Sequence, residues 1–600
     1  QKLQFDLSDS INHGETMLYV ENWHPYQTNF DWGNISITGA ADWVSTKTTA
    51  VRGTKRVTLY KHGYGFSLSG AAPTGTISGN YEYGLNSNAN GGTTASEIYF
   101  DVNQFKKADI TIDTAPAPGT TKVYAGTSTL GNEVTENKLT IDGIAYTGTI
   151  TAYGGYNQSI TGNKDATGNE VILKNNPTFT SDISVYGGFS EKGNATGNTV
   201  TLSGISVGGY SGAHIYGGGS NLGGADVITG NTLRVTTSGN LVHDIYNFQK
   251  LQFDLSDSIN HGETMLHVEN WHPYQTNFDW GNISVIGLDK WVTNLVAHNV
   301  NKPELTLYSH GYAFSLQNYT PSLIGNVGDY EFGKYANTTG TGTVSVSQLL
   351  LNGFRFKNAT ENATGSGAES HAGYSKYGNT TWNNTLNLNS GASYTDARAG
   401  YTDAQKGGSD SNTLNLNAGG TVTNAYGGYT TGLEASDADK AQDPSVTKAD
   451  AKNNTVNING GTVNVGGKVY GGYIATNTQV TPNRASDGDA KNNTINITSG
   501  TFNGANEIYG GYTNGTGKAT GNIVSLGSNA GVFSATNFNN VTLYGGGGAS
   551  ASDVITDNTL NINAQGITAA GIHNFGKIKV NLKDAMTPYT PTNPLLTVTN

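Results

Sequence analysis

What the 600-residue chain lacks already excludes several classes of protein. It contains no cysteine, which rules out a disulfide framework, a zinc ribbon and a thiol nucleophile. Only 13% of its residues are charged, the net charge is −12, and lysines and arginines form no cluster. Nucleic acids and anionic membranes bind to positive surfaces, so neither is an expected partner. No run of eighteen apolar residues occurs, so we expect no direct membrane insertion of this segment.

The chain also has too few large apolar side chains for a broad core. Hydrophobic residues make up 35% of it, and 82 of its residues are glycine. A narrow stack of coils needs few large side chains per coil. This composition therefore favours a repeat architecture that is stabilised by stacking and by ladders of hydrogen bonds.

A large internal duplication divides the sequence. Residues 1–39 and 249–287 differ at only three positions. We therefore expect a first repeat module over 1–248 and a second over 249–575. Residues 576–600 form a degenerate start of a third module or a linker.

Each module combines two kinds of sequence. An aromatic-rich front half is followed by a back half rich in asparagine, glycine and threonine. The repeated coils of the back halves are expected to begin at about 126 and at about 372. Because Gln1 enters in mid-unit, at the position matched by Gln249, we expect the sequence to be a portion of a longer protein.

A shorter repeat runs through each back half. An Asn-Thr-Val/Leu segment alternates with a Tyr-Gly-Gly segment, and Tyr153, Tyr186, Tyr216 and Tyr246 follow one another at steps of 33, 30 and 30 residues. Self-similarity at such a period indicates a solenoid or an array of stacked units.

Alternation within the first type of segment predicts β-strands. Val456 and Ile458 fall on one face of the strand, as does Asn454, whereas Thr455 and Asn457 fall on the other. Asn454 is therefore expected to turn inward at a corner and to bond the same asparagine of the next coil. The ladder positions predicted in this way are Asn198, Asn231, Asn454 and Asn493.

The Tyr-Gly-Gly segment is predicted to form a bend, because glycine adopts positive φ without steric cost. Its tyrosine points outward, so that coils in register carry a row of tyrosines on one outer face. These rings either stack on one another or present an aromatic platform to a partner, and stacking is the favoured interpretation. The row contains Tyr186, Tyr216, Tyr470 and Tyr509.

The same type of strand recurs at a spacing that suits one coil of a solenoid, and this predicts an all-β protein. The expected fold is a parallel β-helix (β-solenoid) with loop insertions, which forms an elongated rod. A β-sandwich, which needs hairpins every eight to twelve residues, and a propeller, which needs four distinct strands per blade, are the weaker alternatives.

The repeat segments carry a family resemblance. Asn454-Thr455-Val456-Asn457-Ile458 and Val469-Tyr470-Gly471-Gly472-Tyr473 resemble the repeat passages of autotransporter (type V secreted) adhesin passengers, and the resemblance covers about 126–248 and 372–575. It implies a right-handed parallel β-helix, display on the outer surface of a bacterium, and a role in adhesion or aggregation.

The aromatic fronts offer a candidate surface for ligands. Residues 21–32 and 269–280 place four aromatic rings among amides and a carboxylate. A pyranose face stacks on such rings while its hydroxyl groups bond the amides. The alternative, which is favoured, is that the rings pack against a widened coil or a junction. The candidate ligand residues are Trp23, Tyr26, Trp32, Trp271, Tyr274 and Trp280.

Other chemistry finds little support in the sequence. A polysaccharide-acting β-helix enzyme, the minor alternative, needs paired carboxylates, and the chain has no Asp-Asp pair. No catalytic residue, metal ligand or cofactor is therefore predicted. The acidic pairs at 437–439 and 487–489 fit no calcium motif, and Asn-x-Ser/Thr strings follow automatically from a repeat of this composition.

Two functions from different classes follow. The first is a non-enzymatic bacterial surface adhesin that mediates attachment or cell-cell aggregation and binds host or bacterial surface glycans or proteins. The second is a structural stalk or filament subunit that self-associates into fibres, since the ends of a solenoid expose strand edges that invite further pairing. Both place the chain in the extracellular space.

Overall fold

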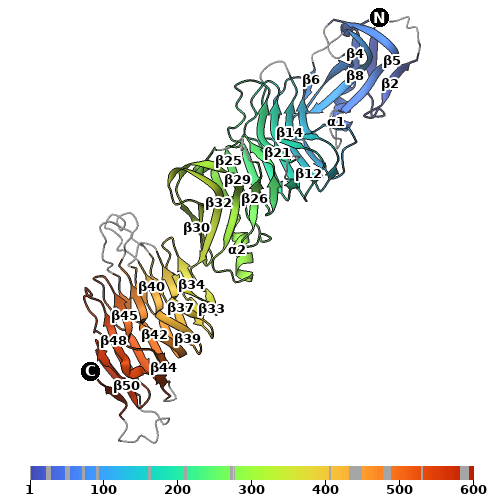
Figure 1. Ribbon diagram of the computed structural model, residues 1–600. Helices are drawn as coiled ribbons and strands as arrows, with labels where there is room; N and C mark the ends of the chain where they lie inside the picture. Colours follow the sequence, from blue (N-terminus) through green and yellow to red (C-terminus); the bar gives the residue numbers. More distant parts are fainter. Residues whose placement is uncertain are drawn as a thin grey trace. The chain divides into compact units, whose positions relative to one another are not determined.

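The computed structural model describes residues 2–21, 29–47, 55–70, 75–89, 93–159, 164–207, 212–270, 275, 277–403, 407–431, 449–476, 488–528, 532–581 and 594–600. The described chain is predominantly β, with most of its strands in parallel sheets and with two α-helices (Figure 1). Neither helix is long and apolar enough to cross a membrane.

Two compact units divide the chain. The first comprises residues 1–294, 305–321 and 335–351, and the second comprises 295–304, 322–334 and 352–600. The second copy of the repeated head, 249–287, therefore lies within the first unit. The compact units thus differ from the repeat modules inferred from the sequence, because the duplicated head packs on the coils that precede it.

Parallel sheets run through the back half of the first module and continue into the second copy of the head. The first sheet consists, in spatial order, of β28 (Ile283–Ile286), β25 (Lys250–Asp254), β22 (Thr232–Val235), β19 (Thr199–Ser203), β16 (Glu170–Lys174), β12 (Lys138–Asp142) and β9 (Asp109–Ile112). The second consists of β10 (Lys122–Ser128), β14 (Ile150–Asn157), β18 (Ile183–Ser190), β21 (Ala213–Ser220) and β24 (Asp244–Tyr246). Strands of the two sheets alternate along the chain, so each repeat adds one strand to both.

Short strands complete the repeats of the first unit. β11 (Val134–Thr135) pairs with β15 (Ala166–Thr167), and β13 (Ala145–Tyr146) pairs with β17 (Thr178–Phe179). β20 (Ser206–Val207), β23 (Asn240–Val242), β26 (Thr264–Val268) and β29 (Glu304–Tyr319) follow one another in a further parallel series. All of these pairs join segments about one repeat apart.

The second unit repeats this arrangement over more strands. One series runs through β33 (Thr360–Ala363), β36 (Thr385–Leu388), β39 (Thr413–Asn417), β42 (Thr455–Ile474), β44 (Thr494–Phe502), β46 (Ile523–Leu526), β49 (Thr559–Ile562) and β52 (Lys577–Val580). The other runs through β34 (Ser366–Ser375), β37 (Ser393–Thr402), β40 (Thr421–Thr430), β42, β45 (Asn506–Thr513), β48 (Val541–Gly547) and β51 (Gly571–His573). Side chains such as Val456, Ile458, Ile495 and Ile497 fill the narrow core between them.

A third series of short strands closes these repeats. It consists of β35 (Thr381–Trp382), β38 (Ser409–Asp410), β41 (Ala451–Lys452) and β43 (Ala490–Lys491). The last repeats add β47 (Ser534–Thr536), η3 (Phe538–Asn540), β50 (Ile567–Ala569) and β53 (Leu596–Val598).

The predicted bend at Tyr-Gly-Gly is wrong. These glycines lie inside strands β18, β21, β42 and β45 and do not have positive φ. They are needed for space, because a Cβ on Gly188 would lie 2.6 Å from Asn198 Oδ1 and one on Gly472 would lie 2.5 Å from Asn493 Nδ2. The glycines thus allow the strand to pass closely over the inward-facing asparagines.

The fronts are not simply widened coils. In the first, β1 (Leu3–Asp6), β2 (Thr16–Val20), β3 (Asn29–Asp31), η1 (Trp32–Asn34) and β4 (Ile35–Thr38) precede α1 (Ala40–Lys47), and an antiparallel series follows, of β5 (Lys55–Ser69), β8 (Thr94–Gln104), β7 (Tyr81–Ser87) and β6 (Thr76–Ser78). The second has β27 (Asn277–Asp279), η2 (Trp280–Asn282), α2 (Leu288–Ala297), β29, β30 (Ser322–Val327), β31 (Tyr330–Ala336) and β32 (Gly342–Arg355). Helices and antiparallel strands therefore interrupt the parallel series.

A buried tryptophan fixes each front helix to the head that precedes it. Trp43 and Trp291 are both 0% exposed. The indole Nε1 of Trp43 donates to the carbonyl of Ile11 at 2.8 Å, and that of Trp291 donates to Ile259 at 2.9 Å. The duplicated sequences thus fold alike at this point.

Candidate binding surfaces

A ladder of buried asparagines runs through the interior of the parallel repeats. Asn454 donates from its backbone N to Asn493 Oδ1 at 3.0 Å and from Nδ2 to the same oxygen at 3.1 Å. Its own Oδ1 receives both bonds from Asn412, each at 3.0 Å. Asn198 makes the same two bonds to Asn231 at 2.8 and 3.4 Å. All five asparagines are 0% exposed.

The ladder leaves no amide atom of these asparagines unused. The Nδ2 of Asn493 also donates to the carbonyl of Ala451 at 2.9 Å, and that of Asn231 donates to Ala195 at 2.9 Å. A buried amide with all its partners stabilises and specifies a fold, whereas an unpaired one is costly. The series also includes positions that were not singled out from the sequence, namely Asn137, Asn169, Asn384, Asn412, Asn522 and Asn558.

Stacked tyrosines run along the outer face of the Tyr-Gly-Gly strands. Tyr186 lies 4.3 Å from Tyr216, centroid to centroid, with 13° between the ring planes. Tyr470 lies 5.3 Å from Tyr509 at 11°. A second column joins the first in the second unit, where Tyr470 also meets Tyr473 edge to face at 4.7 Å. We call these rings the tyrosine columns.

Burial in the columns changes the acidity of the tyrosines. Loss of hydration raises the pKa of Tyr153 and of Tyr429 to about 12. The same cause, followed by the charges of neighbouring phenolates, raises the pKa of Tyr470. Because ring faces in the columns cover one another, they leave mainly ring edges to a partner, and a pyranose needs a free face.

A cation replaces a tyrosine at the start of the columns in the second unit. Arg398 is the register partner of Tyr426, and its guanidinium lies 4.6 Å from the ring centroids of both Tyr401 and Tyr429. Ion pairs to Asp396 at 2.8 Å and to Glu369 at 3.0 Å hold it there. The arginine therefore belongs to the packing of the columns.

Of the six aromatic candidates in the fronts, the structure describes two. Trp32 and Trp280 begin the short helices η1 and η2, and each is 6% exposed. The ring of Trp280 meets Tyr319 edge to face at 4.9 Å. Both indoles are thus packed into the fronts. The other four candidates, Trp23, Tyr26, Trp271 and Tyr274, lie outside the described residues.

An amide ladder also runs along the outside of the second unit. Asn387 Nδ2 donates to Asn362, Asn415 to Asn387, Asn457 to Asn415 and Asn496 to Asn457, at 2.7 to 2.9 Å. Each primary amide has two donor hydrogens and two acceptor lone pairs. The outer amide ladder uses one of each. Alternation along the strand predicts the outward position of Asn457 but no role for it.

A polar hollow of about 720 Å³ lies over the C-terminal part of this outer face. Amides, hydroxyl groups and one ammonium group line it, and none of its described lining residues is a carboxylate. It spans β44, β46, β49 and β52. The lining residues are Asn496, Thr498, Ser525, Gly527, Ser528, Asn561, Asn563, Lys579, Val580 and Asn581.

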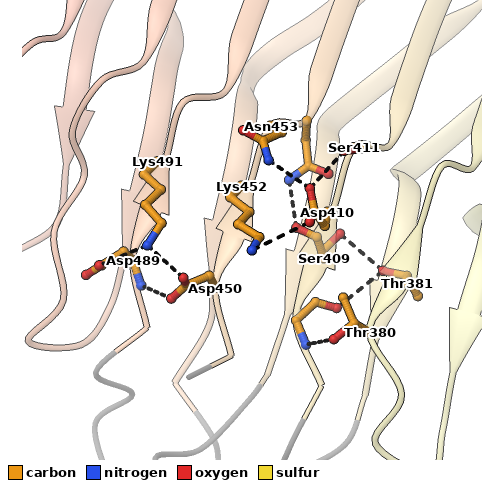
Figure 2. A network of polar contacts seen from close by, with 12 residues as sticks. Thr380, Thr381, Ser409, Asp410, Ser411, Asp450, Lys452, Asn453, Asp489 and Lys491 are labelled. Carbon is orange, nitrogen blue, oxygen red and sulfur yellow. Dashed lines mark hydrogen bonds and ion pairs between the residues drawn. The ribbon is translucent and has the colours of Figure 1, made fainter. Parts of the chain in front are cut away.

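Ion pairs lie along the third series of strands, which consists of β35, β38, β41 and β43. Figure 2 shows Lys491 between Asp450 and Asp489, at 2.9 and 3.5 Å, and Lys452 beside Asp410 at 3.6 Å. Pairs of this kind at a surface contribute about 0–1 kcal/mol each. Two lysines and three aspartates leave these groups a net charge of −1, so the row offers no strong field to a charged ligand.

Two buried glutamates tie the fronts to the back halves. Glu331 is 0% exposed and accepts from Ser375 Oγ at 2.9 Å, from the backbone N of Lys376 at 2.5 Å and from Asn379 Nδ2 at 2.6 Å. Glu82 does the same for residues 128–132. Neither glutamate could be predicted from the sequence, because a single glutamate in a strand carries no local signal of burial.

Among the described residues, no group of three or more histidine, aspartate and glutamate side chains is arranged to hold a metal ion. Neither a family model, nor a curated protein, nor a solved structure matches this chain.

Proposed function

We propose that this chain is a right-handed parallel β-helix that serves as a non-enzymatic adhesin on a bacterial surface. One observation and one general rule support the helix. Successive repeats extend the two long parallel series of each unit, and connections between parallel strands of one sheet are right-handed in nearly all proteins. The resemblance of the repeats to autotransporter passengers supports the extracellular location. The partners are host or bacterial surface glycans or proteins.

The polar hollow is the observation that carries the proposal. It has the size of a ligand site, about 720 Å³, and its amides and hydroxyl groups match the hydroxyl groups of a saccharide. Glycoside hydrolysis requires an acid pair, and no carboxylate stands among the described residues that line the hollow. The chemistry of the hollow therefore favours binding of a glycan over its cleavage.

Binding to a glycan panel tests the proposal. For a glycan that the intact chain binds, the double variant Asn496→Ala with Asn561→Ala should have about tenfold lower affinity. The reason is that two hydrogen bonds to the glycan are lost, and each contributes about 0.5–1.5 kcal/mol. The matched control is Asn387→Ala with Asn415→Ala, which removes two amides of the same outer ladder away from the hollow. Equal loss in both variants, or no glycan bound by the intact chain, would refute a binding role for the hollow.

The fronts require a separate experiment. Trp23→Ala with Trp271→Ala leaves the hollow intact and removes one candidate ring from each copy. If this variant loses glycan binding and the hollow variant does not, the glycan contacts the fronts. If binding is unchanged, the rings of Trp23 and Trp271 serve packing, as the alternative interpretation holds.

The second candidate function is structural, as a stalk or filament subunit. It is favoured by β52, the last strand in the series that begins with β33 in the second unit. All four residues of β52 are exposed, including Ile578 at 55% and Val580 at 46%, and an exposed strand can pair with a further strand.

A further inference from the structure

Two ladders of amides lie on the outward face of the second unit, in the parallel series that begins with β33. In one ladder, Asn415 Nδ2 donates to Asn387 Oδ1 at 2.7 Å and Asn457 donates to Asn415 at 2.8 Å. In the other, two residues further along the strand, Asn417 donates to Asn389 at 3.0 Å. We call the surface of Asn387, Asn389, Asn415, Asn417 and Asn457 the amide face. None of these five residues lines the polar hollow.

The amide face is regular and uncharged. In β39, the leucines that alternate with Thr413, Asn415 and Asn417 are 0% exposed and belong to the core, so these three residues share the opposite face. The strand β36 and residues 455–458 of β42 repeat the pattern, with threonine and asparagine alone at the outward positions. A surface without charge suits an uncharged ligand.

Parallel stacking does not by itself require such a surface. The corresponding sheet of the first unit has the same parallel register, but its outward positions mix charged, apolar and hydroxyl side chains. They include Lys138, Glu170, Ile172, Lys174 and Arg234. The amide face is therefore a property of the surface of the second unit and not a condition of the fold.

Each rung of the amide face keeps hydrogen-bonding capacity that the ladder does not use. A primary amide has two donor hydrogens and two acceptor lone pairs, and Asn415 and Asn457 each use one donor and one acceptor within the ladder. Both side chains are half-buried and make no further hydrogen bond within the part of the chain that the structure describes. Because the two N–H bonds of a planar amide diverge, the unused hydrogen does not lie along the ladder. The face thus offers a donor and an acceptor at each rung, at the strand spacing of about 4.8 Å.

Rows of acetamido groups match this spacing. When sugar chains that carry N-acetyl groups pack side by side, the N–H of one acetamido group donates to the carbonyl oxygen of the next. The same bond sets the spacing of β-strands and of amide ladders, so such a row also repeats at about 4.8 Å. A soluble glycan carries only isolated acetamido groups and therefore cannot meet several rungs at this spacing.

We propose that the amide face binds the surface of an ordered, uncharged polymer of N-acetylated sugars. Each rung donates its second amide hydrogen to an oxygen of the polymer and accepts from an N–H or O–H group, with the ladders parallel to the rows of acetamido groups. A single contact of this kind is weak, but the fold holds the rungs at a fixed spacing, so several bind together without a further loss of freedom. The site is separate from the hollow and goes beyond the glycan binding proposed there.

Co-sedimentation of the full chain with microcrystals of chitin, an ordered polymer of N-acetylglucosamine, tests the site. The intact chain should pellet with chitin and stay in solution with cellulose microcrystals, which carry a hydroxyl group in place of each acetamido group. Asn415→Thr with Asn457→Thr should weaken binding to chitin about tenfold, because one hydrogen bond to the polymer is lost at each of two rungs. Threonine suits the strand, since Thr140 and Thr201 occupy the equivalent third position of β12 and β19.

Two further variants separate the amide face from its surroundings. Asn389→Thr with Asn417→Thr, in the second ladder, should cause a similar loss. Asn563→Thr with Asn581→Thr is the matched control, since it removes two amides that line the hollow, and it should bind chitin like the intact chain. The circular dichroism of each variant should match that of the intact chain, which distinguishes loss of the site from loss of the fold.

Any of four results would overturn the proposal. The first two are an intact chain that does not bind chitin and an equal loss of binding in the hollow variant. The third is equal binding to cellulose, which would show that a lattice of hydroxyl groups suffices. The fourth is a dimer of the intact chain that Asn415→Thr with Asn457→Thr abolishes, which would assign the face to a second copy of this chain. Failure of this site leaves the proposed function intact, because binding of a soluble glycan to the hollow is measured without the polymer.

Discussion

Replacing Asn454 by alanine should loosen the repeats around it. The side chain is 0% exposed, and its Oδ1 is the acceptor for the backbone N–H of Asn412. That N–H is then buried without a partner, which costs about 1–3 kcal/mol, and the lost bonds of Nδ2 to Ser409 and Asn493 add to it. We expect the free energy of local opening to fall by about 2–4 kcal/mol.

Hydrogen exchange followed by mass spectrometry measures this opening strand by strand. Exchange should accelerate in β39, β42 and β44 and should stay unchanged in the first unit. Asn457→Ala is the matched control, because Asn457 makes the same kind of ladder bonds on the outer face, where water replaces a lost partner. Similar acceleration in both variants would contradict this expectation, because it would show that the buried asparagines contribute no more to local stability than the exposed ones.

Raising the pH above about 10 should unfold the parallel repeats. In the folded chain, burial raises the pKa of column tyrosines such as Tyr153 and Tyr429 from 10.0 to about 12. Below pH 10 these phenols are neutral in both states, and the full stability is present. Between about 10 and 12 the unfolded chain releases protons that the folded chain retains, so stability falls as the pH rises. Many tyrosines contribute, so the loss is cooperative and large.

Tyrosinate absorbance and circular dichroism, recorded together against pH, check this expectation. The late part of the ionisation should coincide with loss of β-structure. Tyr470→Phe with Tyr509→Phe removes two ionisable groups from the columns and should move the transition to higher pH, whereas Tyr64→Phe outside the columns should not. Ionisation of all tyrosines near pH 10, with the β-signal intact, would contradict the stacked and buried columns.

Some of this architecture follows from which residues share a face of a strand. Asn454 falls on the same face as Val456 and Ile458, and all three are 0% exposed in the structure. The inward position of the asparagine is local information, because alternation along a strand fixes which side chains share a face. The repeat spacing adds the partner, since the next coil offers the same residue at the same place.

The Tyr-Gly-Gly segments show where local information fails. Gly471 and Gly472 suggest a bend, yet they lie in the strand β42. Their role appears only when the next coil is present, because a Cβ on Gly471 would collide with the backbone of Gly510. A glycine required by close approach looks the same in sequence as a glycine required by positive φ.

The fronts were the least predictable part. The helices α1 and α2 span only eight and ten residues, too few for a helical period to stand out in a chain dominated by strands. The residues that anchor them, Trp43 and Trp291, lie outside the aromatic strings that drew attention. The outer polar hollow could not be predicted from the sequence either, because its amides and hydroxyl groups come from segments far apart in sequence.

Disulfide formation between engineered cysteines tests the central claim, that successive repeats stack in parallel register. The natural chain has no cysteine, so the background is clean. Asn457 and Asn496 are register partners on the outer face, one strand spacing of about 4.8 Å apart. Asn415 and Asn496 are two spacings apart, about 9.6 Å, beyond the reach of about 7 Å.

We expect Asn457→Cys with Asn496→Cys to form a disulfide under mild oxidation in the folded chain, and Asn415→Cys with Asn496→Cys to remain reduced. The opposite outcome, a free pair at 457 and 496 or an efficient bridge between 415 and 496, would contradict the stacking of these repeats.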